Sequence, residues 1–242
     1  MDQLLIALDV ESATRAVDLA DSLRGLAGGF KIGSRLFTSE GPSIVKTLVA
    51  RGDRVFLDLK FHDIPNTVAQ AVAAATSLGV WMVNVHAAGG TRMMEAARDA
   101  AKETAARSGV PAPIVIAVTV LTSMNTAALT EVGFSTDSTT VLDQVTRLAT
   151  LAEAAGLDGV VASPQETATI RASCRSDFTI VTPGIRGAGA AAGGKDDQER
   201  TMSAGEAIAA GASYIVVGRP IIAAADPRAA AERLVELMIH AQ

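Results

Sequence analysis

The sequence has 242 residues, a formal net charge of −5 and a hydrophobic content of 49%. The length suits one α/β barrel, although length alone also allows two small domains. The acidic balance argues against a general nucleic-acid surface, which needs a basic face. No apolar run approaches the ~20 residues of a membrane span.

The number of cysteines and the first residues of the sequence indicate the cellular compartment of the protein. Cys174 is the single cysteine, so neither an intramolecular disulfide nor a cluster of thiolate metal ligands can form. The first nine residues carry no basic leader of the kind that starts a signal peptide. Both observations lead us to expect a cytoplasmic protein.

Short apolar stretches alternate with helical patterns along the chain. The expected strands are 4–10, 28–33, 54–61, 82–86, 113–121, 159–163, 179–184 and 214–218. The expected helices are 14–26, 40–50, 68–78, 91–107, 125–131, 138–155 and 226–241, with Ala-rich helical segments between the last three strands. This alternation, without a linker, predicts a single (β/α)8 TIM barrel over residues 1–242 rather than a doubly wound sheet.

The third expected strand carries an unusual density of charge. Asp58 and Lys60 share one face of the strand, because side chains alternate, and the other face is apolar. Asp63 lies just beyond the strand, where Pro65 suits the first turn of a helix. An exposed Asp-Lys pair on an edge strand is the ordinary explanation. The neighbours are too hydrophobic for an edge, however, so these charges need buried partners.

Other candidate site residues, most of them polar, stand at the carboxyl ends of further expected strands, where barrel active sites lie. They are Asp9, Lys31, His86, Thr122, Ser123, Pro183, Arg186, Gly218 and Arg219. Some have ordinary explanations: Asp9, Thr122 and Ser123 suit helix caps, and a lysine can reach solvent along its own stem. For His86 we favour a structural hydrogen-bonding role, because no second metal ligand stands at suitable spacing.

Two of these residues indicate a phosphate site. Arg186 follows the seventh strand and Arg219 the eighth, where barrels recurrently bind phosphate. The Gly- and Ala-rich segment 187–195 is typical of a lid that closes over a ligand. Gln198, at its far end, is placed to supply an amide to the phosphate.

The motif Asp58-Leu-Lys60-Phe-His-Asp63-Ile-Pro-Asn-Thr67, with Phe30–Gly33, Val181–Arg186 and Val217–Pro220, resembles the bacterial orotidine 5′-monophosphate decarboxylase family. The resemblance extends from Asp9 to Arg219. It implies decarboxylation of orotidine 5′-monophosphate to uridine 5′-monophosphate, the last step of de novo UMP synthesis. It also implies that no cofactor and no metal are used.

The resemblance further implies a role for each site residue. Lys60 is the proton donor in a network of alternating charges formed by Lys31, Asp58, Lys60 and Asp63, and Asp63 enters the site of the other subunit of a homodimer. The implied substrate contacts are Asp9, Lys31 and Thr67 at the ribose, Thr122 and Ser123 at the pyrimidine, and Arg186, Gln198, Gly218 and Arg219 at the phosphate. Ile64 and Pro183 complete the expected substrate-binding set.

Two other interpretations stay open. The sugar-phosphate relatives, 3-keto-gulonate-phosphate decarboxylase and hexulose-phosphate synthase, share the Asp-x-Lys-x-x-Asp element but use Mg²⁺ on an enediolate. The segments 65–67 and 183–186 favour the orotidylate reaction. A catalytically inactive barrel that senses a phosphate ligand or acts as a scaffold is a different class, and the intact charged set argues against it.

Overall fold

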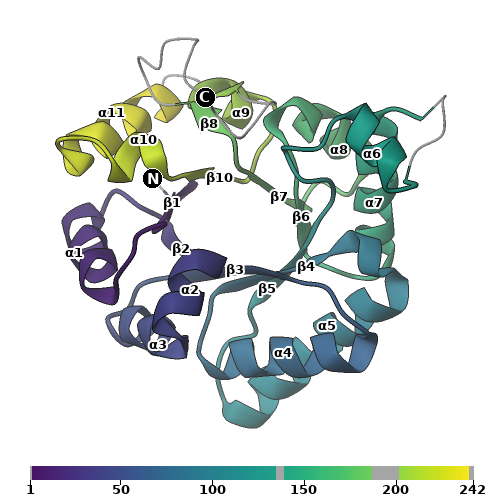
Figure 1. Cartoon of the computed structure of the whole chain (residues 1–242), viewed down its shortest axis with the longest axis horizontal. Coiled ribbons are helices and arrows are strands. Elements are labelled where there is room, and N and C mark those ends of the chain that lie inside the picture. The colour runs from purple at the N-terminus through teal and green to yellow at the C-terminus, as the bar shows by residue number, and fades with distance from the viewer. Residues whose placement is uncertain (1, 135–138, 187–201, 240–242) are drawn as a thin grey trace.

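A closed barrel of eight parallel strands forms the centre of the part of the chain that the structure describes, residues 2–134, 139–186 and 202–239 of this computed structural model (Figure 1). The strands, in spatial order, are β1 (Leu4–Ala7), β10 (Tyr214–Val217), β7 (Thr179–Thr182), β6 (Gly159–Val161), β5 (Ile114–Val118), β4 (Met82–His86), β3 (Val55–Phe61) and β2 (Gly29–Gly33). The ring closes where Leu5 of β1 pairs with Val216 of β10. The predicted (β/α)8 barrel is confirmed.

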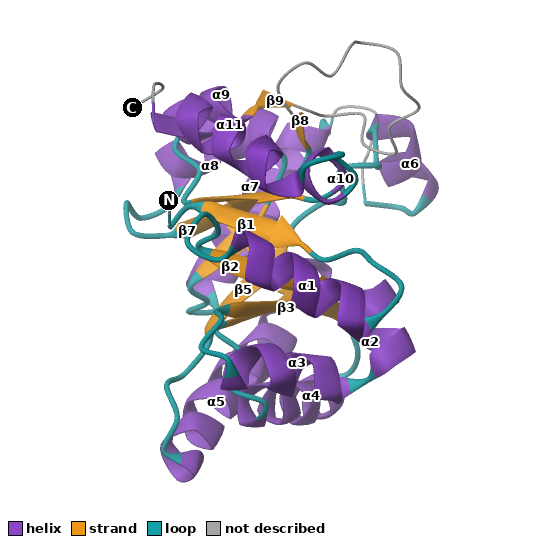
Figure 2. Cartoon of the chain, turned by 90° about the vertical axis from the view of Figure 1, so that its left-hand side faces the viewer, coloured by secondary structure: helices purple, strands orange, loops and turns teal. Residues whose placement is uncertain are grey.

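Helices surround the strands on the outside (Figures 1 and 2). They are α1 (Ala13–Leu23), α2 (Ser34–Glu40), α3 (Pro42–Ala50), α4 (Pro65–Ser77), α5 (Thr91–Ser108), α6 (Thr126–Glu131), α7 (Val141–Ala154), α8 (Thr167–Ser173), α9 (Ala204–Ala209), α10 (Arg219–Ile222) and α11 (Pro227–Ile239). Two 3-10 turns, Ala87–Gly89 and Pro164–Glu166, lie among them. None of the helices in the described ranges combines the length and the apolar character needed to cross a membrane.

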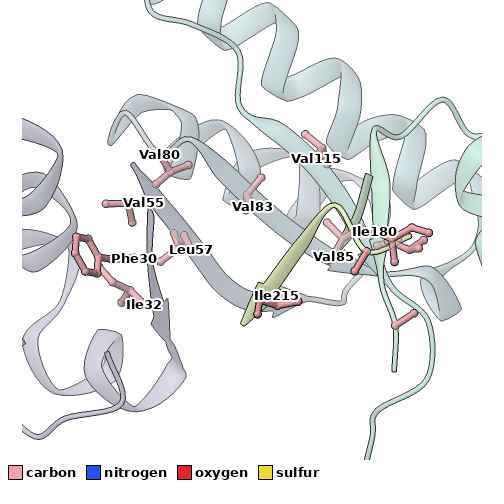
Figure 3. Packing of buried hydrophobic residues seen from close by; sticks show 14 of the residues in the cluster. Phe30, Ile32, Val55, Leu57, Val80, Val83, Val85, Val115, Ile180 and Ile215 are labelled. Atoms are coloured by element: carbon pink, nitrogen blue, oxygen red, sulfur yellow. The ribbon is translucent and has the colours of Figure 1, made fainter. Parts of the chain in front are cut away.

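The side chains of each strand alternate between two apolar layers. On β1, Leu4 and Ile6 belong to the larger layer between strands and helices, while Leu5 and Ala7 point into the barrel. Figure 3 shows part of the larger layer. The inner cluster consists of Leu5, Ala7, Phe56, Met82, Ile116, Val181 and Val216. The barrel is therefore a packed core rather than a pore, and polar side chains can gather only beyond this cluster.

Five strands end earlier than the sequence predicted, each at its carboxyl end. The residues that leave the sheet become caps and turns. Ser163 caps the 3-10 turn that follows β6, and Gly218 is the N-cap residue of α10. Gly184, after β7, has a φ of 83°, a left-handed conformation that ends a strand. The rim of the barrel is therefore made of loops at these positions.

Helix α2 and a small second sheet are among the features that were not predicted. Helix α2 follows β2 directly, and Gly41, with a φ of 66°, separates it from α3. The short strands β8 (Ile185–Arg186) and β9 (Met202–Ser203) form a two-stranded parallel sheet, in which Ile185 pairs with Met202. Strands of two residues carry no periodicity that a sequence pattern could reveal. This small sheet joins the two described ends that flank residues 187–201.

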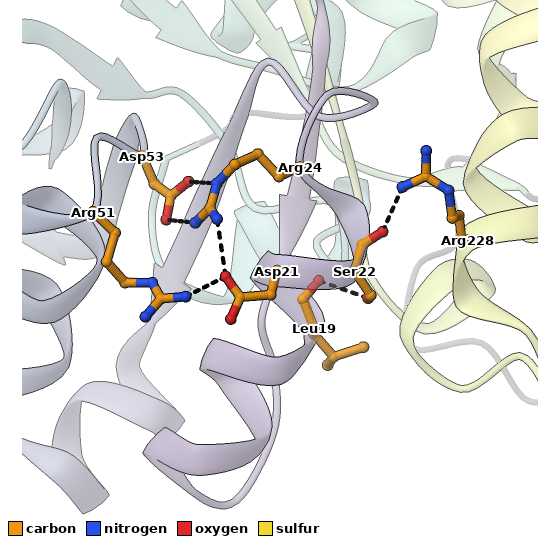
Figure 4. Close-up of polar contacts among 7 residues, drawn as sticks. All are labelled: Leu19, Asp21, Ser22, Arg24, Arg51, Asp53 and Arg228. Atoms are coloured by element: carbon orange, nitrogen blue, oxygen red, sulfur yellow. Dashed lines mark hydrogen bonds and ion pairs between the residues drawn. The ribbon is translucent and has the colours of Figure 1, made fainter.

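A network of ion pairs ties α1 to the segment that precedes β3 (Figure 4). Arg24 donates two hydrogen bonds to Asp53, from Nε to Oδ1 over 3.0 Å and from Nη2 to Oδ2 over 2.8 Å. Arg24 and Arg51 both contact the carboxylate of Asp21. The side chain of Asp53 is only 5% exposed, and Arg24 is its bidentate partner.

We therefore predict that Arg24→Ala lowers the free energy of unfolding by about 1–3 kcal/mol, because it leaves the Asp53 carboxylate buried without its partner. The matched control is Glu11→Ala, which removes an ion pair to Arg35 whose Glu11 side chain is 86% exposed and should cost below ~0.5 kcal/mol. Urea unfolding of the three proteins measures both values. Equal losses in the two variants would contradict the prediction.

Candidate active site

Three charged side chains meet at the carboxyl ends of β2 and β3. Asp58 lies between two ammonium groups: Lys60 Nζ donates to its Oδ1 over 2.7 Å, and Lys31 Nζ lies 3.3 Å from its Oδ2. Lys31 also lies 3.6 Å from Oδ1 of Asp9. Asp9, Lys31, Asp58 and Lys60 thus form a chain of alternating charges.

Strand β3 is irregular where it carries these residues. Leu57 pairs with Val83 of β4, and the next pair is Phe61 with Val85, so three residues of β3 lie opposite the single residue Asn84. Such β-bulges are common next to active sites, where they redirect a side chain. The sequence predicted a regular strand here, and that expectation is corrected.

Within the bulge of β3, Lys60 has the unusual backbone conformation. Its φ of 53° lies in the left-handed region, and it is the sole non-glycine residue with a positive φ in the described ranges. This conformation costs a residue with a side chain roughly 1–2 kcal/mol. The fold therefore holds Lys60 in a strained backbone conformation at the position that carries the central charge.

Asp58 is ionised in spite of its burial. It is 8% exposed, and burial alone would raise the pKa of its carboxyl. The charges of Lys31 and Lys60, together with hydrogen bonds from Lys60 and Asn84, outweigh that effect and hold the pKa below its usual value. Asp58 is therefore a carboxylate at neutral pH.

His86 ends β4 close to this cluster. Its ring centroid lies 5.4 Å from that of His62, with the two rings inclined by 35°. Burial, followed by the electrostatic influence of His62 and Lys60, lowers the pKa of His86 to about 4, so its ring is neutral at pH 7. Its hydrogen-bonding role stays a prediction, since the contact observed is with another ring.

Two glycines leave room for the charged groups. A Cβ atom on Gly33 would come within 3.1 Å of Lys31 Nζ and 3.3 Å of Asp9 Oδ1. A Cβ atom on Gly218 would lie 3.7 Å from Asp9 Oδ2. The end of β10, where a phosphate contact was predicted, is thus adjacent to Asp9.

The structure does not bring Asp63 to the cluster. The carboxylate of Asp63 accepts a hydrogen bond from the backbone N–H of Ile64 over 2.6 Å. Both residues are exposed, and the apolar side chain of Ile64 is 66% exposed. Among the described residues no ion pair of Asp63 is found. Of the four residues expected to form the catalytic network, the chain itself unites Lys31, Asp58 and Lys60.

The remaining predicted residues are distributed around the same rim. Thr67 is exposed in the first turn of α4, and Thr122 and Ser123 lie in the turn between β5 and α6. Pro183 is half-buried after β7, and Arg219 is exposed at the start of α10.

The rest of the predicted phosphate end is described only in part. Arg186 belongs to β8, and segment 187–195 and Gln198 lie outside the described residues.

Sequence reasoning missed Asn84. This residue is fully buried on β4, donates from Nδ2 to Asp58 Oδ1 over 2.6 Å and accepts the backbone N–H of Lys60 over 2.8 Å. A signal was present, because Asn84 interrupts an apolar strand and lies two residues before His86, on the same face. A polar residue buried in a strand requires partners, and here the partners are the two central residues of the site.

Comparison with known proteins places these observations in a family. Residues 2–234 match the family described as "Orotidine 5'-phosphate decarboxylase / HUMPS family". The chain is 53% identical to an orotidine 5'-phosphate decarboxylase of Moorella thermoacetica, over 96% of this chain and 90% of the relative. It is 52% identical to one of Syntrophotalea carbinolica, over 99% of this chain and 96% of the relative.

A solved structure gives the same result. The crystal structure of orotidine 5'-phosphate decarboxylase from Lactobacillus acidophilus is 34% identical and superimposes with a TM-score of 0.83, covering 97% of this chain and 98% of that one. The chain therefore belongs to the orotidine 5'-phosphate decarboxylase / HUMPS family.

Proposed function

We propose that Lys60 is the proton donor in the decarboxylation of orotidine 5′-monophosphate to uridine 5′-monophosphate, which this chain catalyses as the last step of UMP synthesis. The observation that carries the proposal is the ammonium of Lys60, 2.7 Å from the buried carboxylate of Asp58 and next to Lys31. Family membership supports the reaction, and this cluster supports the roles of the residues.

The chemistry matches an ammonium group in this position. When the bond between C6 and the carboxylate breaks, CO₂ leaves and the electron pair stays on C6 in the plane of the ring. The ring carbonyls cannot delocalise that pair, so a nearby positive charge must stabilise it. Lys60 supplies the charge and then transfers a proton from Nζ to C6, which makes it both electrostatic catalyst and general acid.

Asp58 and Lys31 prepare Lys60 for this step. The ionised carboxylate of Asp58 accepts a hydrogen bond from Lys60 Nζ, which orients the ammonium group. A substrate carboxylate placed beside Asp58 would be repelled, and the repulsion is relieved as neutral CO₂ departs. Lys31, paired with both Asp58 and Asp9, keeps Asp58 charged without competing for the proton transfer.

The rest of the rim is assigned to binding. Asp9, Lys31 and Thr67 contact the ribose, Thr122 and Ser123 the pyrimidine, and Arg186, Gln198, Gly218 and Arg219 the phosphate, with Ile64 and Pro183 also at the substrate. The proximity of Gly218 to Asp9 supports adjacent ribose and phosphate positions. Binding energy from the phosphate then contributes to catalysis at the far end of the substrate.

We also propose a homodimer in which Asp63 completes the site of the partner subunit. Support comes from its exposure, together with that of Ile64, and from the lack, among the described residues, of an ion pair between Asp63 and the charge cluster of its own chain. Two exposed groups of this kind beside an active site suit a two-fold interface.

We also propose the extent of the domain and the compartment. The extent of one domain over residues 1–242 is supported by the pairing of β1 with β10, and a cytoplasmic location by the single cysteine.

Decarboxylation is expected to continue in excess EDTA, because protonation by Lys60 needs no Lewis acid. Among the described residues, no three His, Cys, Asp or Glu side chains are grouped to hold a metal ion. The assay follows the loss of absorbance of orotidine 5′-monophosphate, with and without EDTA and with Mg²⁺ restored.

Each other result has a definite meaning. A strict Mg²⁺ requirement would move the assignment to the sugar-phosphate branch of the family, for which 3-keto-gulonate phosphate is the control substrate. Absence of turnover with either substrate would favour the inactive sensor or scaffold.

A further inference from the structure

Asn84 joins the side chain of Asp58 to the main chain of Lys60. Its Nδ2 donates to Asp58 Oδ1 over 2.6 Å, and its Oδ1 accepts the N–H of Lys60 over 2.8 Å. The partners determine which amide atom is which, because a carboxylate only accepts and a backbone N–H only donates. One buried amide thus serves both residues that act on the substrate.

The bond to Lys60 meets a need that the bulge creates. Three residues of β3 lie opposite Asn84 alone, so the bulge takes Lys60 out of the regular ladder. A main-chain N–H away from water requires an acceptor, and the Asn84 side chain supplies it. This bond holds Lys60 in its left-handed conformation, with Nζ 2.7 Å from Asp58.

The bond to Asp58 determines which carboxylate oxygen faces which lysine. Oδ1 accepts from both Asn84 and Lys60, whereas Oδ2 is left to Lys31 at 3.3 Å. Without the amide, the carboxylate could rotate and exchange these partners. Asn84 is 0% exposed, so water does not reach the amide to compete for its hydrogen bonds to Asp58 and Lys60.

We propose that Asn84 is a positioning residue, whose amide holds the Asp58 carboxylate and the Lys60 backbone in their catalytic arrangement. The inference rests on the proposed role of Lys60 as proton donor and deepens it. The position needs a donor and an acceptor on one short side chain. An ionised aspartate lacks the donor, leucine lacks both groups, and glutamine is longer by one methylene.

The first test is Asn84→Leu, which keeps the branched shape and the number of side-chain heavy atoms and removes both hydrogen bonds. We expect kcat for orotidine 5′-monophosphate to fall about 100-fold, the effect of displacing a catalytic group by roughly 1 Å. KM should change little, because the phosphate and ribose contacts come from other strands. Met82→Leu is the matched control on the same strand and face, and its kcat should stay at the parent value.

The second test separates positioning from space filling. Asn84→Asp keeps the shape and the acceptor but places a second carboxyl against Asp58. Among the described residues, the other charged or titratable groups of this cluster are Lys60, Lys31 with its partner Asp9, and His86 with its neighbour His62, while the β5 residue paired with position 84 is the apolar Ile116.

At low pH the introduced carboxyl is protonated and donates to Asp58 as the amide does, whereas at higher pH the two carboxylates repel each other. The ratio of variant to parent kcat is therefore expected to rise as the pH falls. A ratio that does not change with pH would overturn the proposal.

The outcomes also distinguish this inference from the function on which it rests. If the parent protein decarboxylates the substrate and Lys60→Ala does not, a folded Asn84→Leu protein with parental kcat overturns the positioning role alone. If the parent protein shows no decarboxylation, the proposed function fails first. Urea unfolding verifies that Asn84→Leu is folded. If Asn84→Leu does not fold, the pH dependence of kcat for Asn84→Asp decides whether Asn84 is a positioning residue.

Discussion

Lys60→Ala is expected to lower kcat by about 10⁴-fold or more, while uridine 5′-monophosphate still binds measurably. The substitution removes the charge that stabilises the carbanion and the proton that quenches it, and each effect alone is typically worth at least 10²-fold. Nucleotide binding should persist because the groups proposed for the ribose and phosphate belong to other segments, among them Asp9 and Arg219.

Two further variants make the result specific. Lys60→Arg keeps a positive charge but cannot give up a proton at neutral pH, so it should also be nearly inactive. Lys46→Ala, which removes an exposed lysine of α3, should keep the parental rate. Turnover is measured by absorbance and binding by calorimetric titration with the product nucleotide. Retention of more than a few per cent of the rate by Lys60→Ala would contradict its role as proton donor.

Part of the charge cluster could be predicted, because it follows from strand geometry. Residues two apart in a strand share a face, which places Asp58 with Lys60 on the inner side, after Phe56. In the parallel barrel the neighbouring strand β2 lies alongside, with Gly33 opposite Asp58, so Lys31 comes within reach of the same carboxylate. Periodicity and strand order therefore suffice to bring Lys31 and Asp58 together, whereas the placement of Lys60 also depends on the bulge.

The positioning of that cluster could not be predicted, because it depends on a departure from regular geometry. The left-handed backbone of Lys60 and the bulge around it exist only once β3 has paired with β4. Lysine has no preference for a positive φ, so the residue type at position 60 gives no sign of that conformation. The buried Asn84 was the available clue, since an amide inside an apolar strand must have partners there.

The ends of the strands and the short helices also could not be predicted fully from sequence patterns. The strands were placed correctly from apolar runs, but several of their ends were extended too far, since residues such as Ser163 and Gly218 cap the next element instead. Helix α2 was missed because it is only seven residues long and Gly41 separates it from α3. Short elements depend on capping and on tertiary contacts more than on periodicity.

The position of Asp63 leads to a test of the dimer. Asp63 is exposed, bonds to the N–H of the next residue and is not joined to Lys60 in its own chain by an ion pair within the described ranges. If the partner subunit faces this rim, each site takes Lys60 from one chain and Asp63 from the other. Lys60→Ala and Asp63→Asn proteins are then both expected to be nearly inactive alone.

Mixing the two inactive proteins after reversible dissociation should restore activity. A mixed dimer carries both substitutions in one site and leaves the other site with its native Lys60 and Asp63. Random reassociation makes about half of the dimers mixed, so about a quarter of all sites, and of parental activity, should return. Subunit exchange is verified separately with a tagged chain, and each variant incubated with itself is the control. Exchange without recovery would show that Asp63 acts in the site of its own subunit, because a site built within one chain always retains one of the two substitutions.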